Sequence, residues 1–383
     1  MNAPLPSAQS TAGLSTSSKL WRVLLLFAIL YAFLVAIQLM SGSIKLLGKE
    51  TSTALFDGVT NPFAALAVGV LATVLVQSSS TTTAMIVALV GATDSQLSIE
   101  TAVPMIMGAN IGTTVTNTMV SIGSVRRSQE FKRAFSAATV HDFFNLMCVG
   151  LFLPLEMATG FLSKTARFLT GSLDGLGGAS YKSPIKTAVK SGFNAIVGVL
   201  EDLGLADKGL AITVLVLGIG LTFLCLIQIT RVMKQLLAGS LEKSINAALE
   251  RSGVIGIVIG ILMTAAVQSS SITTSLLVPM CASGVLTLRN AFPIMLGANL
   301  GTTITALMAS LAADEVAGLT IAVVHSLFNT AGILVFYPIK KLRDIPMKLS
   351  VGLAEKAAAN PIWILAYVLG VFVALPILGW WLF

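Results

Sequence analysis

The chain contains one uncharged polar run twice within apolar sequence, and this duplication limits the folds that it can adopt. Residues 76–80, Val-Gln-Ser-Ser-Ser, return unchanged at 267–271, and the twelve-residue segments 76–87 and 267–278 agree at eight positions. Such a run is either an ordinary solvated turn between two helices or a polar site held inside a membrane.

The lengths of the apolar arms around each run favour the second alternative. In the first copy, residues 58–76 carry no charge, but only 84–92 remain apolar after the run. In the second copy the arms are 252–267 and 276–286. A spanning helix needs about 20 apolar residues, and irregular backbone at membrane depth is tolerated only where it is buried by protein or lines a cavity. We therefore expect two re-entrant helical hairpins, at about 58–93 and 252–286.

The composition is that of a polytopic membrane protein embedded in a lipid bilayer. Of 383 residues, 55% are hydrophobic and 11% are charged, and the mean hydropathy is +0.89. The formal net charge of +7 would suggest a nucleic-acid partner in a soluble protein, but here Lys and Arg cluster in loops and indicate topology instead. The three cysteines lie in apolar runs and there are only two histidines, which argues against a disulfide framework or a structural zinc site.

A second motif is also duplicated. Residues 104–116 and 293–305 match at eight of thirteen positions, and each carries Gly-Ala-Asn-(Ile/Leu)-Gly-Thr-Thr inside an apolar run. Glycines and small polar groups at such a place predict a helix that is broken near the membrane midplane. Small residues also allow close helix packing, although two asparagines at that depth are unfavourable without a role.

Two polar pairs share a helix face in later spans. His141 and Asn145 lie four residues apart, as do His325 and Asn329. Interhelical hydrogen bonds explain these pairs more simply than ion transfer does. Asp142 has no acidic counterpart in the second copy. An intramembrane carboxylate is a functional candidate, but Asp142 could equally lie near a helix end in water.

The duplication divides the chain into two repeats of three crossings each. We expect a disordered cytoplasmic tail at 1–18, transport repeats at 19–153 and 209–338, an extracytoplasmic linker at 154–208, and a cytoplasmic loop with a final transmembrane helix at 339–383. An odd number of crossings inverts the second repeat, and most Lys and Arg then fall on one side, as the positive-inside rule requires. The predicted fold is all-α and polytopic, with two inverted-topology repeats, each containing a re-entrant hairpin and a broken helix, plus a C-terminal transmembrane helix.

This architecture is typical of secondary transporters, whose sites lie at the repeat interface near the midplane. Hydroxyls at a helix N-terminus favour an anion, and neutral amide oxygens with free backbone carbonyls suit sodium. No Lys or Arg lies in either hairpin, so an anion that enters must bring cations. This reasoning predicts coupled transport of an anion with cations.

An intramembrane hydrolase fits less well because no His or paired Asp lies near either Ser run, and a structural scaffold would not explain why the polar runs recur.

The residues that carry both duplications also resemble a known family. The two Gln-Ser-Ser-Ser segments, the Gly-Ala-Asn elements and Thr-Val-His-Asp-Phe-Phe-Asn at 139–145 are similar to the type II sodium–phosphate cotransporter family over about residues 20–338. The resemblance implies a cell-membrane transporter, not an enzyme, that couples sodium influx to phosphate uptake by alternating access. It implies no cofactor other than sodium as coupling ion. A sodium-coupled symporter of another small anion and an anion channel are the alternatives.

The resemblance also assigns site residues, all at or near the two hairpin tips and the two Gly-Ala-Asn elements. Phosphate is expected at Gln77, Ser78, Ser79, Ser80, Thr81, Gln268, Ser269, Ser270, Ser271 and Thr273. Sodium is expected at Gln77, Ser79, Thr82, Thr83, Asn110, Thr113, Thr114, Gln268, Ser270, Thr274, Asn299, Thr302 and Thr303.

Overall fold

The computed structural model describes residues 16–48, 51, 59, 61–122, 128–176, 184–237 and 253–382. Every secondary-structure element in these ranges is helical. Most of the tail that is predicted to be disordered lies outside the described residues. Five helices in the described ranges are long and apolar enough to cross a membrane: Ser17–Leu47, Ser128–Thr159, Asp207–Met233, Leu288–Ser310 and Val316–Phe336.

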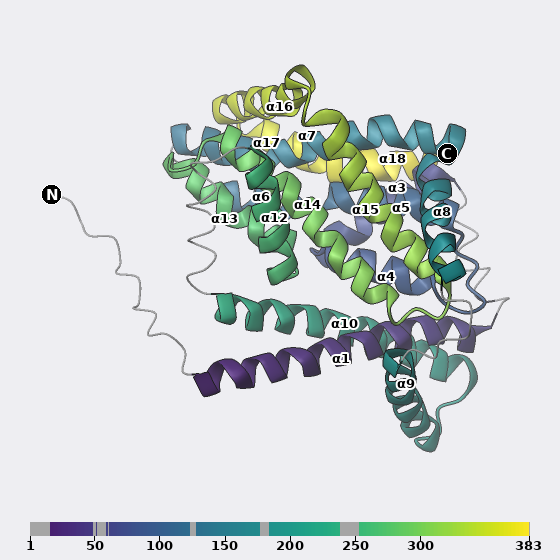
Figure 1. Ribbon diagram of the computed structural model, residues 1–383. Helices are drawn as coiled ribbons and strands as arrows, with labels where there is room; N and C mark the ends of the chain where they lie inside the picture. Colours follow the sequence, from purple (N-terminus) through teal and green to yellow (C-terminus); the bar gives the residue numbers. More distant parts are fainter. Residues whose placement is uncertain are drawn as a thin grey trace.

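Two helices with equivalent places in the duplication pack together along one edge of the molecule. They are α1 (Thr16–Leu47) and α10 (Asp207–Leu237), which lie side by side in Figure 1. Arg22 Nε, near the start of α1, donates to Gln235 Oε1, near the end of α10, at 2.9 Å. Farther along, a Cβ on Gly218 of α10 would lie 2.8 Å from Met40 Cγ of α1. Because the start of one helix meets the end of the other, the two helices are antiparallel.

Each Gln-Ser-Ser-Ser run divides an apolar segment into two short helices. The first pair is α3 (Pro62–Val76) and α4 (Ser79–Val90), and the second is α12 (Gly253–Val267) and α13 (Ser270–Ser283). None of these helices reaches the length of about 20 residues that a crossing needs. The helix pairs agree with the expected hairpins, whose first residues (58 and 252) lie outside the described part, and their re-entrant path stays a prediction.

The first Gly-Ala-Asn element breaks its helix, but the second does not. In the first copy, α5 (Ile99–Gly112) and α6 (Val115–Ile122) are separated by a two-residue turn. In the second, α14 (Leu288–Ser310) continues through the equivalent position. The prediction of a broken helix in both repeats is therefore wrong for the second.

The duplicated motif itself does not account for this difference. Both elements contain the same Gly-Thr-Thr, so the local signal for a break is equal. On α6, however, Asn117 Oδ1 accepts hydrogen bonds from the hydroxyls of Thr274 and Ser275 on α13, both at 3.0 Å. The residue at the equivalent place in α14 is Ala306, which has no side-chain acceptor. The break therefore accompanies a polar contact that only the first copy makes.

Glycines of the same elements bring neighbouring helices into backbone contact. A Cβ on Gly108 of α5 would lie 2.1 Å from the Leu66 carbonyl oxygen of α3. A Cβ on Gly297 of α14 would lie 2.0 Å from the Ile257 carbonyl oxygen of α12. Any side chain at these positions would push the helices apart. The close-packing interpretation therefore holds for the glycines.

The expected linker contains helices. α7 (Ser128–Thr159) continues past the expected boundary at 153, and α8 (Phe161–Leu176) and α9 (Pro184–Asp202) follow it. The carboxylate of Glu156 accepts hydrogen bonds from the backbone N–H groups of Leu162 at 2.6 Å and Ser163 at 3.2 Å. A carboxylate at a helix N-terminus stabilises that helix, which helps explain why α8 forms in a segment without a long apolar run.

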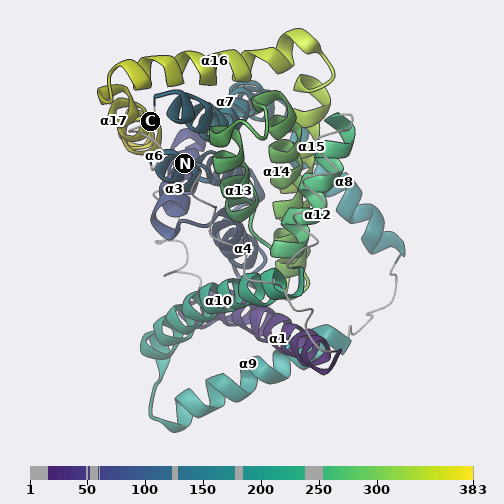
Figure 2. The same ribbon diagram turned by 90° about the vertical axis from the view of Figure 1, so that its left-hand side faces the viewer.

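The last part of the chain is helical throughout residues 340–382 except at one short turn. α15 (Val316–Phe336) is followed by α16 (Lys340–Ala359), where the sequence predicts a loop. Figure 2 shows α16 lying along one end of the bundle next to α7, with which it is in contact. Its buried face is a stripe of small residues, Pro346, Ser350, Ala354 and Ala357.

The final apolar run is helical as predicted, but it contains one π turn. It consists of α17 (Ile362–Leu369), η2 (Gly370–Ala374) and α18 (Leu375–Leu382). The Leu375 N–H donates to the Gly370 carbonyl, five residues earlier. Pro376 follows directly and has no N–H to donate, so a wider turn accommodates its ring. That this segment crosses the membrane stays a prediction.

Candidate functional site

Both polar runs begin with a glutamine in the left-handed backbone region. Gln77 has φ of 56° and Gln268 has φ of 55°. Residues other than glycine seldom adopt positive φ, and such strain concentrates at functional sites where the surrounding structure holds it. The next residue caps the following helix: Ser78 Oγ accepts from Thr81 N at 3.2 Å, and Ser269 Oγ accepts from Ile272 N at 3.4 Å. The two tips thus share one backbone geometry.

The two tips contact each other, although they are far apart in the sequence. Ser80 Oγ of the first tip donates to the backbone carbonyl of Gln268 in the second at 3.3 Å. Both residues are buried. Because α4 begins at Ser79 and α13 at Ser270, two helix N-termini lie at this contact. The structure therefore brings the two predicted site segments together.

Each tip glutamine is held by hydrogen bonds at both ends of its amide. Nε2 of Gln77 donates to the carbonyl three residues earlier at 2.5 Å, and its Oε1 accepts from Thr116 Oγ1 at 3.0 Å. Gln268 repeats this arrangement: its Nε2 donates to the carbonyl three residues earlier, and its Oε1 accepts from Thr305 Oγ1 at 2.8 Å. Thr116 and Thr305 are equivalent residues of the second duplicated motif. They were not among the site residues expected from the sequence, although their place in the duplication could have identified them.

The tips differ in their exposure. Gln268 is only 8% exposed, whereas Gln77 is exposed. The equivalent residues therefore differ in how far protein atoms surround them, even though their hydrogen bonds match.

The tip hydroxyls mostly donate to carbonyls of their own helices. Thr82 Oγ1 donates to the Ser78 carbonyl at 3.1 Å, and Thr83 Oγ1 donates to the Ser80 carbonyl at 3.2 Å. A hydroxyl that uses its proton in this way still has an oxygen lone pair, which can ligate a hard cation. The buried hydroxyl residues of the two tips are Ser79, Ser80, Thr81, Thr82, Thr83, Ser270, Thr273 and Thr274, and Ser78, Ser269 and Ser271 are half-buried.

The two asparagines of the Gly-Ala-Asn elements have different partners. Asn299 Nδ2 donates to Asn145 Oδ1 at 2.8 Å, and Asn299 Oδ1 is hydrogen-bonded to His141 Nε2. Asn110 Nδ2 instead donates to the Ile106 carbonyl of its own helix at 2.9 Å. Asn299 therefore joins the two repeats through its side chain, whereas the Asn110 side chain is used locally.

The backbone carbonyls of these two asparagines have equivalent partners. Asn145 Nδ2 donates to the Asn110 carbonyl at 2.9 Å, and Asn329 Nδ2 donates to the Asn299 carbonyl at 3.4 Å. The prediction of interhelical hydrogen bonds is thus confirmed for His141 and for both later asparagines. His325 is buried, and its Nδ1 has no hydrogen-bond partner in the described part of the chain.

The four threonines that follow the asparagines make local contacts. Their hydroxyls donate to carbonyls three or four residues earlier, at distances of 2.7 to 3.2 Å. These hydrogen bonds do not connect them with the tips. The residues concerned are Thr113, Thr114, Thr302 and Thr303.

Asp142 is fully buried, so its alternative place in water at a helix end is wrong. The Tyr367 hydroxyl of α17 donates to Asp142 Oδ2. The Tyr367 ring packs against Phe135, Phe143 and Phe372, with ring centroids 5.8 to 6.2 Å apart. This carboxylate therefore interacts with the C-terminal helix.

Comparisons with known proteins agree on one family. The family model described as Na⁺/Pi-cotransporter matches residues 32–178 and 221–351. The sheep protein "Sodium-dependent phosphate transport protein 2A" is 31% identical over 430 residues, which covers 93% of this chain and 67% of that protein. The rat protein of that name is 32% identical over 430 residues (94% and 67%), and human "Sodium-dependent phosphate transport protein 2B" is 31% identical over 446 residues (93% and 64%).

No solved structure matches the chain significantly. The two segments that the family model matches contain both Gln-Ser-Ser-Ser tips and both Gly-Ala-Asn elements. The similarity therefore includes the residues that meet at the contact between the tips.

Proposed function

The chain belongs to the Na⁺/Pi-cotransporter family, and on this premise we propose that it couples sodium influx to the uptake of inorganic phosphate by alternating access. It is a transporter in the cell membrane and not an enzyme. Phosphate and sodium are held between the two Gln-Ser-Ser-Ser tips. The observation that carries the proposal is the hydrogen bond from Ser80 to the Gln268 carbonyl, which places two uncharged helix N-termini together.

The chemistry of this contact suits an anion together with cations. Two helix N-termini and their hydroxyls attract a negatively charged group. Neither helix pair contains Lys or Arg, so the protein supplies no countercharge there. Sodium ions must supply it, and the hydroxyl oxygens whose protons are used within their helices are suitable ligands. Electrical balance in a low-dielectric site then couples the movement of the anion to that of the cation.

The assignment of residues follows the two tips. Gln77 and Gln268 hold the tips in place through Thr116 and Thr305. The serines and threonines of the tips bind the ions directly. Phosphate ligands are drawn from Ser78, Ser79, Ser80, Thr81, Ser269, Ser270, Ser271 and Thr273, and sodium ligands from these hydroxyls with Thr82, Thr83 and Thr274. The second motif (Asn110, Asn299 and the threonines that follow them) surrounds the ion path.

The repeats are inverted, and the two helix pairs enter the membrane from opposite sides. Antiparallel packing of α1 and α10 supports this arrangement, because equivalent helices of inverted repeats must run in opposite directions. With this topology most Lys and Arg of the sequence fall on one side, as the positive-inside rule requires. Such repeats provide two related conformations, one open to each side of the membrane.

Reconstitution tests the proposed transport. Labelled phosphate should enter proteoliposomes that contain the purified chain when sodium is high outside, because the tips supply no positive charge to balance the anion. With potassium in place of sodium, uptake should fall to the level of protein-free vesicles. Equal uptake in both salts would exclude sodium coupling, and equal uptake of sulfate would show a different anion specificity.

Labelling of engineered cysteines tests the inverted topology. Ser95 follows α4 and Ser283 ends α13, and both side chains are at least partly exposed. In a background in which the three native cysteines are alanine, Ser95→Cys should react with an impermeant reagent from outside and Ser283→Cys from inside. Intact and inverted vesicles give the two measurements. Reaction of both positions from one side would contradict inversion.

A further inference from the structure

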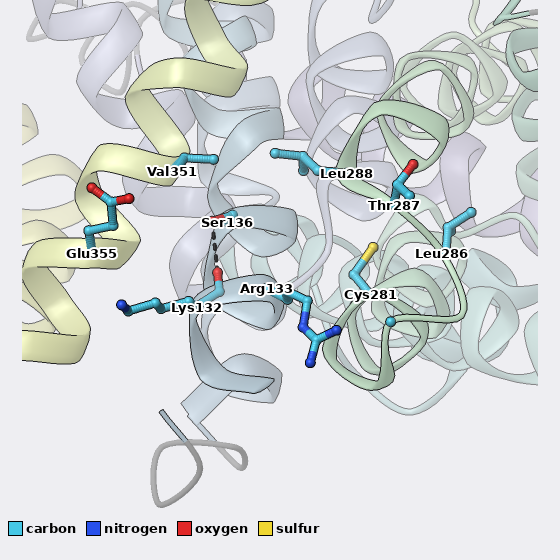
Figure 3. Close-up of a pocket in the computed structure, with 10 residues that line it drawn as sticks. Lys132, Arg133, Ser136, Cys281, Leu286, Thr287, Leu288, Val351 and Glu355 are labelled. Carbon is cyan, nitrogen blue, oxygen red and sulfur yellow. Dashed lines mark hydrogen bonds between the residues drawn. The ribbon is translucent and has the colours of Figure 1, made fainter. Parts of the chain in front are cut away.

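A cavity of about 330 Å³ lies at the base of the second helix pair, at the opposite end of α13 from its tip. Figure 3 shows three segments around it: the start of α7, the connection from α13 to α14, and α16. Lys132 and Arg133 of α7 lie at its edge, and their side chains extend in opposite directions. Much of the remaining wall is apolar, with Leu286, Leu288 and Val351. The cavity is therefore amphipathic.

The two basic side chains are not neutralised by a neighbouring acid. Among the described residues, neither Lys132 nor Arg133 has an ion-pair partner within 4.0 Å. Arg133 Nε donates only to the Gln129 carbonyl, one turn earlier, at 3.4 Å. Glu355 of α16 also lines the cavity, so two basic groups face one acidic group. The site carries a net positive charge and has guanidinium donors available.

The equivalent place at the base of the first helix pair is closed. There, a Cβ on Gly91 would lie 2.6 Å from Ala313 Cβ and 3.0 Å from Gly318 Cα. α15 begins with Val316 and Ala317 at the positions where α7 has its two basic residues. The duplicated fold therefore requires neither the cavity nor the positive charge. In the part of the chain that the structure describes, the cavity and two basic side chains without an ion-pair partner lie together at the second base, which indicates a ligand that uses both.

We propose that this cavity binds one anionic phospholipid, with the headgroup phosphate against the Arg133 guanidinium group, Lys132 adding positive charge on the α16 side, and part of an acyl chain along the apolar wall. Basic pockets between membrane helices on the cytoplasmic side bind anionic headgroups, and the guanidinium group matches phosphate geometry. Inorganic phosphate offers the same headgroup chemistry but leaves the apolar wall uncovered, so the observations favour the lipid. The proposal rests on the cytoplasmic placement of the basic loops proposed above, but not on transport.

The neighbouring surface of α16 agrees with a membrane interface. Ile345, Leu349 and Val351 are exposed apolar residues on this helix, which also carries four Lys and one Arg. A helix with exposed apolar residues between basic ones is typical of the boundary between headgroups and acyl chains. A lipid in the cavity would connect α16 and α7 to the base of α13, and so would connect the interface to the second helix pair.

Thermal unfolding of the purified full-length chain in detergent tests the proposal. Phosphatidylglycerol should raise the Tm by at least about 2 °C, because a ligand that binds only the folded state stabilises it. Phosphatidylcholine with the same acyl chains should not. Lys132→Gln with Arg133→Gln should remove most of the shift. Lys340→Gln with Lys341→Gln, which removes the same charge from exposed positions at the start of α16, should keep it.

Adding inorganic phosphate in place of the lipid tests whether the cavity binds free phosphate or the phosphate of a phospholipid headgroup. It should stabilise the parent chain and the Lys132/Arg133 variant equally, because its site lies at the tips. A phosphate shift that disappears in this variant would assign the cavity to free phosphate and overturn the proposal. Equal Tm shifts with both lipids, or a phosphatidylglycerol shift retained in the Lys132/Arg133 variant, would also overturn the proposal.

If the double variant does not fold, Arg133→Gln alone gives the same comparison, and native mass spectrometry counts the bound lipid. Absence of any phosphate shift would contradict the proposed function but not the lipid site.

Discussion

Gln268→Glu is expected to reduce sodium-driven phosphate uptake by about a hundredfold or more, whereas Gln77→Glu should reduce it by about tenfold or less. At Gln268 the change places a carboxylate at a residue that is 8% exposed and removes the Nε2 donor to a backbone carbonyl. A buried charge without a partner is unfavourable by about 3 kcal/mol or more, and each 1.4 kcal/mol is about tenfold. Gln77 loses the same donor, but its side chain is exposed; if this side faces the proposed ion path, water there solvates the added charge and the loss approaches about 0.5–1.5 kcal/mol.

Uptake into proteoliposomes, normalised to inserted protein, measures both variants. Gln77→Ala and Gln268→Ala serve as uncharged controls and should be weaker changes than Gln268→Glu, because they remove the hydrogen bonds without adding charge. Thr305→Val removes the donor to Gln268 Oε1 and should therefore also reduce phosphate uptake, as Gln268→Ala does. Normal transport by Gln268→Glu would show that the tip does not border the ion path. Equal losses for both glutamates would mean that the difference in exposure is irrelevant to transport.

The duplication made the helix breaks and their polar tips predictable from the sequence. A polar run between apolar arms that are too short to cross leaves few arrangements other than two short helices, and the structure has them at both sites. The antiparallel packing of α1 and α10 also agrees with the odd number of crossings inferred from the apolar runs. These features follow from local length and polarity, which the sequence displays directly.

Other features depend on contacts that no local pattern contains. The unbroken α14 contains the same Gly-Ala-Asn and Gly-Thr-Thr residues as the broken α5–α6 region, so these motifs do not predict which helix breaks; the break accompanies the hydrogen bonds of Asn117, which Ala306 cannot accept. α16 carries its lysines on its exposed side and Pro346 within the helix, and its buried stripe of small residues gave no strong apolar signal. The contact from Ser80 to Gln268 spans 188 residues, so equivalence in the duplication suggests that the tips are related but does not show that they touch.

Asn299→Ala is expected to destabilise the chain far more than Asn110→Ala, although the two residues are equivalent in the duplication. Removing the Asn299 side chain leaves His141 Nε2 and Asn145 Oδ1 without their partner, and both residues are fully buried. Each orphaned group is unfavourable by about 1–3 kcal/mol, so the loss is about 2–6 kcal/mol. Asn110→Ala removes one hydrogen bond to the Ile106 carbonyl, which is worth about 0.5–1.5 kcal/mol.

Thermal unfolding in detergent measures this difference, and Asn299→Ala should lower the Tm by at least about 4 °C, with a clearly smaller change for Asn110→Ala. Adding Asn145→Ala to Asn299→Ala should lower the Tm by less than the sum of the two single changes, because the two side chains share one hydrogen bond.

The sodium dependence of phosphate uptake distinguishes this structural role from sodium binding. If both asparagines ligate sodium, each alanine variant should raise the sodium concentration needed for half-maximal uptake by a similar factor. Such equal sodium shifts, with equal losses in Tm, would contradict the asymmetric roles inferred from their hydrogen bonds. A large Tm loss for Asn299→Ala alone would instead support the inference that the side-chain amide of Asn299 holds the two repeats together.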